Sequence, residues 1–386
     1  MPRHNIAFYS DTYLPAVDGV VTSMLTFKKE LERRGNKVYI FASKKGIRKS
    51  KAYESEDVFL YPGVDFKPYP QYSVAVFPFY SSLKLSSLGI DVIHSQTPFM
   101  MGFNALIAAK IGKIPLVSTY HTMIDSKSSS AYYPKNNSIK KFAGATMWKY
   151  IKFYYNQCDV TIAPSQAVAD MLGARGVGNT RIVPNSIDLK RFNPKVRGDA
   201  MRARLGLKDK ERVVLYLGRV SREKKIEVML KAARSVTARN RDVTFVVGGT
   251  GPAVDYYRRA AKKLGVLDRV RFIGFVEDKD LPGLYAASDV LCLPSTFETQ
   301  GIVSIEAMAV GKPVVAADYL ALRELIENGA NGERFKAGDY TSCARKIEKV
   351  LNKCDAYRKE AVKTAGKFSV EKVTDELLKV YDSVVD

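Results

Sequence analysis

Short apolar runs alternate with longer amphipathic stretches along the whole chain. Runs such as 213–217 and 289–293 are almost continuously apolar, which is typical of strands that are covered on both faces. The stretches between the runs, such as 223–239, repeat apolar residues at helical spacing. This alternation predicts an α/β protein with parallel sheets covered by helices.

The pattern places each element at a defined range. Strands are expected near 4–10, 37–42, 57–61, 74–78, 91–95, 115–119, 159–163, 180–183, 213–217, 243–247, 269–275, 289–293 and 313–316. Helices are expected near 19–35, 81–88, 101–111, 138–157, 165–173, 197–205, 223–239, 252–265, 279–287, 301–310 and 320–328, and the stretch 339–386 is expected to be helical.

A chain of 386 residues is too long for one ordinary core and predicts two domains. The segment 184–194 holds turn residues and two prolines, which favours a boundary there. We expect one doubly wound domain at 1–190, joined by the C-terminal helix 369–386, and a second at 195–368. Ligands bind such sheets at the carboxyl ends of the strands, so the cleft between the domains is the expected site.

Charge and cysteine content narrow the setting. The formal net charge of +21 predicts an anionic partner, which would be nucleic acid, an anionic membrane or a phosphorylated substrate, unless the charge only solubilises the surface. The cysteines lack metal-binding spacing, which favours a reducing cytoplasm. No apolar run reaches ~18 residues, and the first residues enter a strand without a signal peptide.

The pair Glu298 and Glu306 brackets the most informative stretch. An apolar strand ends in the loop that carries Glu298, and Gly301 opens the helix that carries Glu306. The amides of Gly301, Ile302 and Val303 have no intrahelical partners, so this helix start suits a phosphate. The two carboxylates would then hold the hydroxyls of an attached sugar. The alternative is a helix glutamate and a solvated loop carboxylate with no common role.

Further candidates follow other strands. Arg219 and Lys224 follow the strand 213–217, where two cations suit a diphosphate. Gly19 stands where the first helix begins, so its backbone can approach a phosphate. His121 follows the strand 115–119. The alternatives are a basic solvated loop, an ordinary turn and a buried, satisfied histidine, and we expect the last for His94 more than for His121.

These residues, in this order, resemble the retaining glycosyltransferases of family 4, whose GT-B architecture has two facing Rossmann-like domains. The resemblance covers essentially the whole chain. The matching motifs are Glu298 with Glu306, Gly218-Arg219 with Glu223-Lys224, and Pro184-Asn185-Ser186-Ile187-Asp188, where serine replaces the usual glycine. No Walker A loop, zinc-ligand spacing or Gly-X-Ser-X-Gly elbow competes with this interpretation.

The resemblance implies a role for each candidate residue. Arg219 and Lys224 would hold the donor diphosphate, assisted by the amides of Gly19, Gly301, Ile302 and Val303. Glu306 would bond the donor ribose, and Glu298 would bond the hydroxyls of the donor sugar. Phe275 and Val276 would lie against the nucleobase. His121 would lie beside the transferring sugar, so His121, Glu298, Arg219 and Lys224 form the expected catalytic set. The family needs no metal or other cofactor. The acceptor would attack on the face from which the nucleotide leaves, so catalysis would rest on positioning and electrostatics.

A narrower resemblance is to the bacterial glucosyltransferases that glycosylate diacylglycerol. It rests on Glu298-Thr-Gln-Gly301, on Tyr13-Leu-Pro with Gly19-Val-Val-Thr22, and on Tyr120-His121-Thr-Met. It implies transfer of glucose from a UDP-linked donor to a membrane lipid, by a peripheral protein on the cytoplasmic face of the cell membrane. The alternative is a GDP-mannose-dependent enzyme, or a hexosyltransferase with a soluble sugar or polysaccharide acceptor.

The segment 138–159 predicts a helix that could rest on an anionic membrane. Its expected core stripe is Ile139, Ala143, Met147, Tyr150 and Tyr154. Its opposite stripe, Lys141, Trp148, Lys152 and Tyr155, combines lysine with aromatic residues as interfacial surfaces do. The proline- and aromatic-rich segment 66–80 is a second candidate. The alternative is a solvated lysine face with an incidental tryptophan.

Two other classes of protein are alternatives to this enzyme. A nucleic-acid-binding protein would account for the charge, but no known binding motif occurs and the basic residues are spread over both halves, so we expect no nucleic-acid partner. An inactive scaffold of this fold is disfavoured because every expected donor residue is present.

Overall fold

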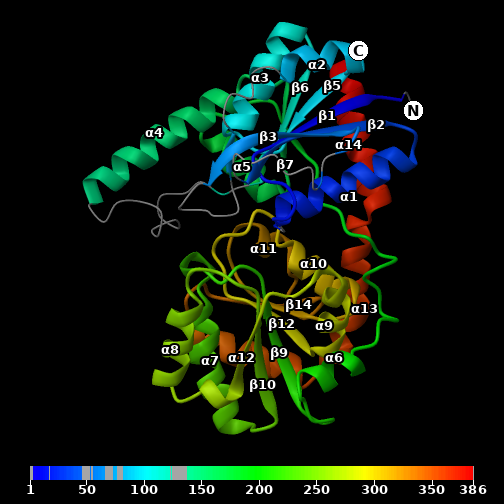
Figure 1. The fold of residues 1–386 in the computed structure, drawn as a ribbon. Helices are drawn as coiled ribbons and strands as arrows, with labels where there is room; N and C mark the ends of the chain where they lie inside the picture. Colours follow the sequence, from blue (N-terminus) through cyan, green and yellow to red (C-terminus); the bar gives the residue numbers. More distant parts are fainter. Residues whose placement is uncertain are drawn as a thin grey trace. The chain divides into compact units, whose positions relative to one another are not determined.

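The computed structural model describes residues 3–16, 18–45, 53, 55–65, 73–75, 81–121, 123 and 137–385. The chain divides into two compact units (Figure 1). Unit 1 consists of Met1–Ser186 together with Val370–Asp386, and unit 2 consists of Ile187–Ser369. Each unit is an α/β body with its own sheet.

Unit 1 is built on a sheet with the strand order β4-β3-β2-β1-β5-β6-β7-β8, parallel except for the β3–β4 pair. The strands are β1 (Asn5–Ser10), β2 (Lys37–Lys45), β3 (Val58–Asp65), β4 (Ser73–Ala75), β5 (Val92–Ser95), β6 (Leu116–Thr119), β7 (Val160–Ala163) and β8 (Thr180–Ile182). The helices are α1 (Gly19–Arg33), α2 (Ser81–Leu88), α3 (Met100–Gly112), α4 (Asn137–Tyr155), α5 (Gln166–Ala174) and α14 (Val370–Val385).

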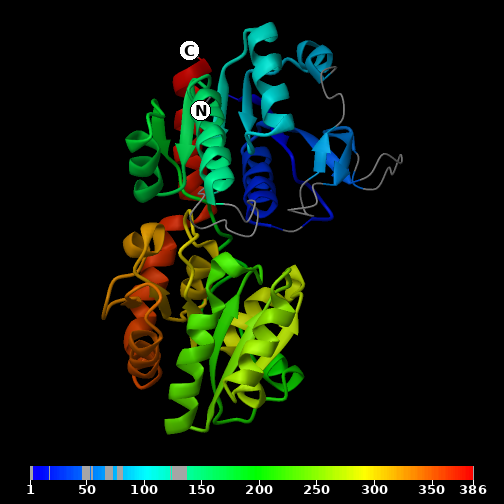
Figure 2. The same ribbon diagram turned by 90° about the vertical axis from the view of Figure 1, so that its left-hand side faces the viewer.

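Two apolar layers hold unit 1 together, one on each face of the sheet. Helices cover both faces (Figure 2). Ala7 and Tyr9 of β1 face the layer formed with α2–α5, whereas Ile6 and Phe8 face the layer formed with α1 and α14. Successive side chains of a strand point to opposite faces, so a strand covered on both faces must be apolar at every position. The continuous apolar runs in the sequence have this cause.

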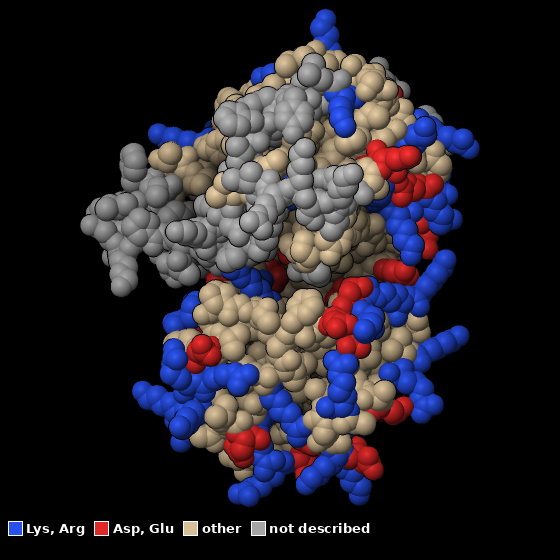
Figure 3. All heavy atoms as spheres, viewed as in Figure 1, with Lys and Arg blue, Asp and Glu red and all other residues tan. Residues whose placement is uncertain are grey.

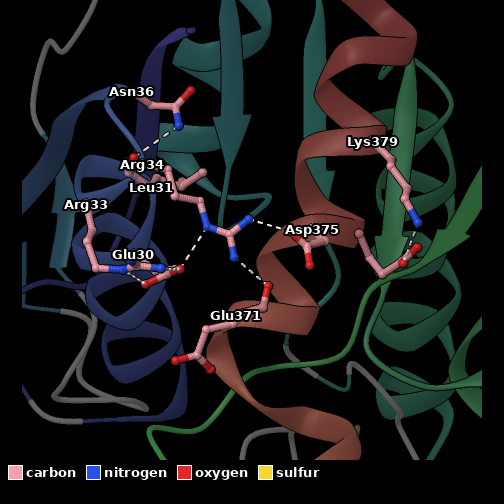
Figure 4. Close-up of polar contacts among 9 residues, drawn as sticks. Glu30, Leu31, Arg33, Arg34, Asn36, Glu371, Asp375 and Lys379 are labelled. Carbon is pink, nitrogen blue, oxygen red and sulfur yellow. Dashed lines mark hydrogen bonds and ion pairs between the residues drawn. The ribbon is translucent and has the colours of Figure 1, made fainter. Parts of the chain in front are cut away.

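The end of the chain belongs to unit 1 through a polar network between α1 and α14 (Figure 4). The guanidinium of Arg34 donates Nε to Glu30 Oε1 at 2.8 Å and Nη2 to the Glu371 carbonyl at 2.6 Å, and Nη1 pairs with Asp375. Arg33 also donates to Glu30, with its Nε 2.7 Å from Oε2. These hydrogen bonds keep the pKa of the buried Glu30 carboxyl below its ordinary value, with burial opposing them.

Replacing Arg34 with methionine is expected to lower the free energy of unfolding by about 2 kcal/mol at pH 7, since Glu30 loses a charged partner and α14 its anchor. A carboxyl whose pKa is lowered in the folded state stabilises the folded protein at pH values above its pKa in the unfolded state. This contribution is lost as the pH falls through the pKa of the folded state. Urea unfolding should therefore show a smaller deficit at pH 3. Lys29→Met, at an exposed position of α1, is the control; an equal loss in both variants would contradict the prediction.

Unit 2 is built on a parallel sheet with the strand order β11-β10-β9-β12-β13-β14. The strands are β9 (Arg212–Leu217), β10 (Val243–Gly248), β11 (Val270–Gly274), β12 (Val290–Leu293), β13 (Val314–Ala317) and β14 (Gly332–Phe335). The helices are α6 (Asp199–Arg204), α7 (Ile226–Arg239), α8 (Val254–Lys263), α9 (Leu281–Ala287), α10 (Ile302–Ala309), α11 (Leu320–Leu325), α12 (Tyr340–Leu351) and α13 (Cys354–Ala365). α7 packs beside α12, and α10 packs beside α9 and α13.

The expected strands and helices are confirmed with shifts of a few residues at their ends, but β14 was not predicted. Its sequence, Gly-Glu-Arg-Phe, is too polar to resemble an inner strand. Glu333 is nevertheless fully buried, and its carboxylate accepts hydrogen bonds from Lys346, Lys349 and the Tyr357 hydroxyl. These partners compensate for the burial of its charge. The expected strand 74–78 is described only over β4.

Candidate active site

The strand order of unit 2 marks where a ligand is expected to bind. From β9 the chain winds outward through β10 and β11, and it then returns to the other side of β9 and winds outward through β12, β13 and β14 (Figure 1). Open parallel sheets bind ligands outside the carboxyl ends of the two strands at such a reversal. Those two strands are β9 and β12, and the loops that follow them carry Arg219, Lys224 and Glu298.

The loop after β9 is fixed against the loop after β10. The Val220 amide donates to the Thr250 carbonyl at 2.8 Å. A Cβ atom at Gly249 would lie 1.9 Å from the Gly218 carbonyl oxygen, and Gly249 has a φ of +119°. Only glycine permits this approach and this backbone conformation. Arg219 therefore leaves a backbone segment that is held on both sides.

Lys224 and Glu298 meet across the strand reversal. The Lys224 ammonium lies 2.8 Å from Glu298 Oε1 and 3.2 Å from the Phe297 carbonyl oxygen. Both side chains are largely shielded from solvent, with exposed fractions of 18% and 16%. The sequence predicted that these residues bind the donor diphosphate and the donor sugar; the structure brings them together as an ion pair.

The start of α10 has the features expected of an anion site. Gly301 precedes the helix with a φ of +81°, and no side chain caps the helix start. The first amides of α10, at Ile302 and Val303, therefore lie at a positively polarised end. The Ser304 hydroxyl in the same turn is buried and has no hydrogen-bond partner in the described part of the chain. A phosphate oxygen would give these groups an acceptor.

Glu306 is buried in α10, and its Oε2 accepts a hydrogen bond of 2.6 Å from the Tyr285 hydroxyl on α9. Burial raises the pKa of this carboxyl to about 7, although the Tyr285 hydrogen bond and the charge of Arg191 oppose the shift. A carboxylate that is poised near neutral pH inside the protein is a frequent feature of functional sites.

Phe275 and Val276 follow β11 and differ in exposure. The Phe275 side chain is 58% exposed and Val276 is buried. The Gly249 amide donates to the Gly274 carbonyl at 2.7 Å, which ties this segment to the loop after β10. The predicted contact of this segment with a nucleobase remains a prediction.

In unit 1 the strand order reverses between β1 and β5. Gly19 begins α1 after β1 and is exposed. The carboxylate of Asp18 accepts hydrogen bonds from the amides of Val20 and Val21 at 2.9 and 3.0 Å. The start of α1 thus already has an anionic partner, unlike that of α10, which weakens the case for a phosphate at Gly19.

His121 follows β6, and its Nε2 lies 3.0 Å from the amide oxygen of Gln96, which follows β5. An amide oxygen only accepts, so this contact places a proton on Nε2. Burial lowers the pKa of His121 to about 4, which keeps the ring neutral at pH 7. Gln96 was not predicted, although its position directly after a strand was the available signal.

His94 is a structural histidine, as its weaker case suggested. Its Nδ1 lies 2.7 Å from the Tyr381 hydroxyl on α14, and its Nε2 lies 2.7 Å from Thr119 Oγ1. It is buried and joins β5 to β6 and to the chain end.

The expected membrane face of α4 is partly wrong. Tyr155 is buried and donates to the Thr119 carbonyl at 3.3 Å, because α4 packs more of its surface on the sheet than one stripe. Trp148 packs against the same core, with the Arg175 guanidinium 3.9 Å from its ring centroid. Lys152 is exposed. The side chain of Lys141 and most of the segment 66–80 lie outside the described residues.

Comparison with known sequence families decides the class of protein. Residues 17–191 match the profile described as "Glycosyltransferase Family 4", and residues 198–368 match that described as "Glycosyl transferases group 1". The chain belongs to glycosyltransferase family 4. The resemblance inferred from the paired glutamates and the basic loop is thereby confirmed.

Two relatives of this family-4 glycosyltransferase have names that describe different reactions. The alpha-monoglucosyldiacylglycerol synthase of Streptococcus pneumoniae is 32% identical over 338 residues, which cover 86% of this chain and 75% of the relative. The GDP-mannose-dependent alpha-mannosyltransferase of Corynebacterium glutamicum is 27% identical over 344 residues, which cover 87% of this chain and 77% of the relative.

Solved structures confirm the GT-B fold of this family-4 glycosyltransferase. The crystal structure of HepE from Anabaena in complex with UDP and glucose has a TM-score of 0.79 and 22% identity, and the match covers 99% of this chain and 100% of that chain. The roles assigned to individual residues remain predictions. No group of three or more potential metal ligands occurs among the residues that the structure describes.

Proposed function

We propose that this glycosyltransferase transfers a hexose, glucose, from a UDP-linked donor to a membrane lipid of the diacylglycerol type, with retention of configuration and without a metal ion or other cofactor. The relative named as an alpha-monoglucosyldiacylglycerol synthase supports the choice of sugar and acceptor. The bound UDP of HepE supports the choice of donor base.

The observation that carries the proposal is the meeting of Lys224 and Glu298 beside the uncapped start of α10. In the absence of donor, the ammonium and the carboxylate neutralise one another. A nucleotide sugar offers a better partner to each, since its diphosphate pairs with the cation and its hydroxyls donate to the carboxylate. The donor thus replaces an internal ion pair rather than water alone.

The chemical step then depends mainly on charged and polar groups that are positioned around the departing diphosphate. Arg219, Lys224 and the amides of Ile302 and Val303 hold the negative charge that develops on the departing diphosphate. The acceptor hydroxyl attacks the anomeric carbon from the face that the diphosphate leaves, and a donor phosphate oxygen takes its proton. The carboxylate of Glu298 positions the sugar for this attack.

The lipid acceptor calls for contact with a membrane, and the exposed end of α4 offers a surface for it. Lys149, Lys152 and Phe153 of α4 and Asn156 directly after it are spaced to share one side, and all four are exposed. Phe153, next to Lys152, is 53% exposed. This combination replaces the stripe expected from the sequence and suits an anionic interface. No described helix is long and apolar enough to cross a bilayer.

Changing Lys149 and Lys152 together to glutamine is expected to weaken binding to phosphatidylglycerol vesicles roughly 30-fold at low salt, since each basic residue near an anionic surface contributes about 1 kcal/mol. Vesicle flotation measures this. Lys263→Gln, at an exposed site on α8 of unit 2, is the control and should bind as the unaltered protein does. Equal binding of the double variant and the control would exclude α4 as the membrane surface.

A screen of donors tests the proposed reaction. Release of nucleotide is measured with UDP-glucose, UDP-galactose, GDP-mannose or ADP-glucose, each with and without vesicles that contain diacylglycerol, and with Glu306→Ala as the inactive control. We expect release from UDP-glucose that depends on the lipid and is lost in the variant. Release from GDP-mannose alone would instead support the function named for the Corynebacterium relative.

Nucleic acid remains outside the proposal. On the face shown in Figure 3, lysine and arginine side chains are spread over the described surface with acidic side chains among them, rather than gathered in one stripe. A nucleic-acid groove needs a continuous basic track.

A further inference from the structure

A cavity of about 340 Å³ opens in unit 2 at the amino-terminal ends of β9, β12 and β13. The candidate donor residues follow the carboxyl ends of the strands, so this cavity lies at the opposite ends of the strands of the same sheet. Its lining comes from the first residue of β9, the residue before β12, the turn 311–313 before β13, and the segment 352–358 around the start of α13. It belongs to no part of the site described above.

The cavity lining is rich in cations. Arg212, Lys312, Lys353 and Arg358 line it, against two carboxylates, Asp289 and Asp355.

The carboxylate of Asp289 already has partners. Its Oδ1 lies 2.7 Å from Arg212 Nη1, and its Oδ2 accepts from the Val213 amide at 2.8 Å. Three cations therefore remain for the single carboxylate of Asp355. The cavity has an excess of positive charge.

Lys312 and Arg358 lie close together in the cavity lining. Lys312 is half-buried, and no carboxylate among the described residues lies within ion-pair distance of its ammonium. Burial lowers the pKa of Lys312; the charge of Asp289 opposes this, and that of Arg358 adds to it. Two cations are thus held close together with insufficient negative charge nearby.

The position of Arg358 is fixed from two sides. Its Nη2 donates to the Pro194 carbonyl at 3.1 Å. Its side chain also lies over Gly311, where a Cβ atom would be 3.1 Å from Arg358 Cγ. A guanidinium held in this way loses little conformational entropy when it binds a ligand.

The chemistry of the lining selects the ligand. Ammonium and guanidinium groups only donate hydrogen bonds, so they require an anion with several acceptor oxygens. A cavity of about 340 Å³ falls in the range of small-molecule sites and has room for more than one phosphate group. We propose that this cavity binds a small phosphomonoester through Lys312 and Arg358, as a site separate from that of the nucleotide-sugar donor. The phosphomonoester is either a free metabolite or the headgroup of a phospholipid.

Protection of Lys312 from acylation in the unaltered full-length chain tests this directly. Its lowered pKa makes the free amine reactive, and a bound phosphate would raise the pKa and cover the amine. We expect glycerol 3-phosphate to slow acylation of Lys312 about tenfold, read by mass spectrometry, with Lys263 on α8 as the internal reference. Protection by vesicles of phosphatidic acid but not by glycerol 3-phosphate would identify the lipid headgroup as the source. The absence of protection by either probe would overturn the proposal.

Calorimetry with variants separates this site from the donor site. Lys312→Met and Arg358→Met are each expected to weaken the binding of the protecting probe about tenfold or more, the loss typical of one hydrogen bond to a charged group. Lys263→Met should leave it unchanged. Lys224→Met should also leave it unchanged, whereas UDP-glucose binding falls. A loss in Lys224→Met alone would place the phosphate in the donor site and refute a second site without touching the proposed function.

Discussion

Replacing Lys224 with methionine is expected to lower kcat/KM for the nucleotide sugar by about 10²- to 10³-fold, the usual loss when one charge-stabilising group is removed from a transition state. Lys224 is the cation that meets Glu298 at the strand reversal of unit 2. Methionine keeps most of its length and loses its charge, so the departing diphosphate is less well neutralised. Initial rates of nucleotide release at varied donor concentration measure the effect.

The neighbouring residue provides the matched control. Lys225 is exposed and precedes α7, and its charge is not directed into the Lys224–Glu298 pair. Lys225→Met should keep kcat/KM within about twofold of the unaltered protein, while Lys224→Arg should recover part of the lost activity because it restores the charge. Equal losses in Lys224→Met and Lys225→Met would mean that the overall positive field, and not this position, supports the reaction.

Glu306→Gln is expected to weaken donor binding about 10- to 100-fold above pH 7 and to remove the pH dependence of binding near neutrality. The Glu306 carboxyl has a pKa raised to about 7 by burial. As pH falls through 7, the unaltered carboxylate gains a proton and loses an acceptor for a ribose hydroxyl. Donor affinity should therefore fall below pH 7 in the unaltered protein and stay level in the variant. Isothermal titration with UDP-glucose from pH 5.5 to 8.5 measures both curves.

The stability of the same variant should change in the opposite direction. A carboxyl whose folded pKa lies above its unfolded value stabilises the protein below the unfolded pKa, and this contribution is lost as pH rises through the folded value. At pH 8 the unaltered protein therefore carries a buried charge that glutamine lacks. Glu306→Gln should raise the Tm by several degrees at pH 8, for a gain on the order of 1–3 kcal/mol, and by little at pH 4. A lower Tm for the variant at pH 8 would show that the Tyr285 hydrogen bond outweighs the burial of charge.

The sequence could predict elements that bury apolar side chains. It could not predict elements whose burial depends on contacts with residues far away in the sequence. β1 and β9 are apolar at nearly every position because helices cover both faces of each sheet. β14 was not predicted, because the carboxylate of its buried Glu333 accepts hydrogen bonds from Lys346, Lys349 and Tyr357. The local sequence pattern does not reveal these contacts. The same reason explains Tyr155, whose burial depends on the width of the surface that α4 places on the sheet.

For the site, the sequence supplied residue types and their order along the chain, but not their pairing. That Lys224 and Glu298 form an ion pair follows from the adjacency of β9 and β12 in the sheet, which is a property of strand order. Gln96 was missed for a similar reason, because its importance lies in one contact with His121 across neighbouring strands. Asp18 was missed because a helix cap needs only a short polar residue, which is common in any loop.

The return of the chain to unit 1 determines the order in which the two units can finish folding during synthesis. α14 supplies Val373, Leu377 and Tyr381 to one face of the unit 1 sheet, and these residues leave the ribosome only after the whole of unit 2. The second unit can close its core while the first still exposes an apolar face, which reverses the usual sequence of N-terminal folding first. In that interval, the uncovered face of unit 1 is the part of the nascent protein most exposed to aggregation and to chaperones.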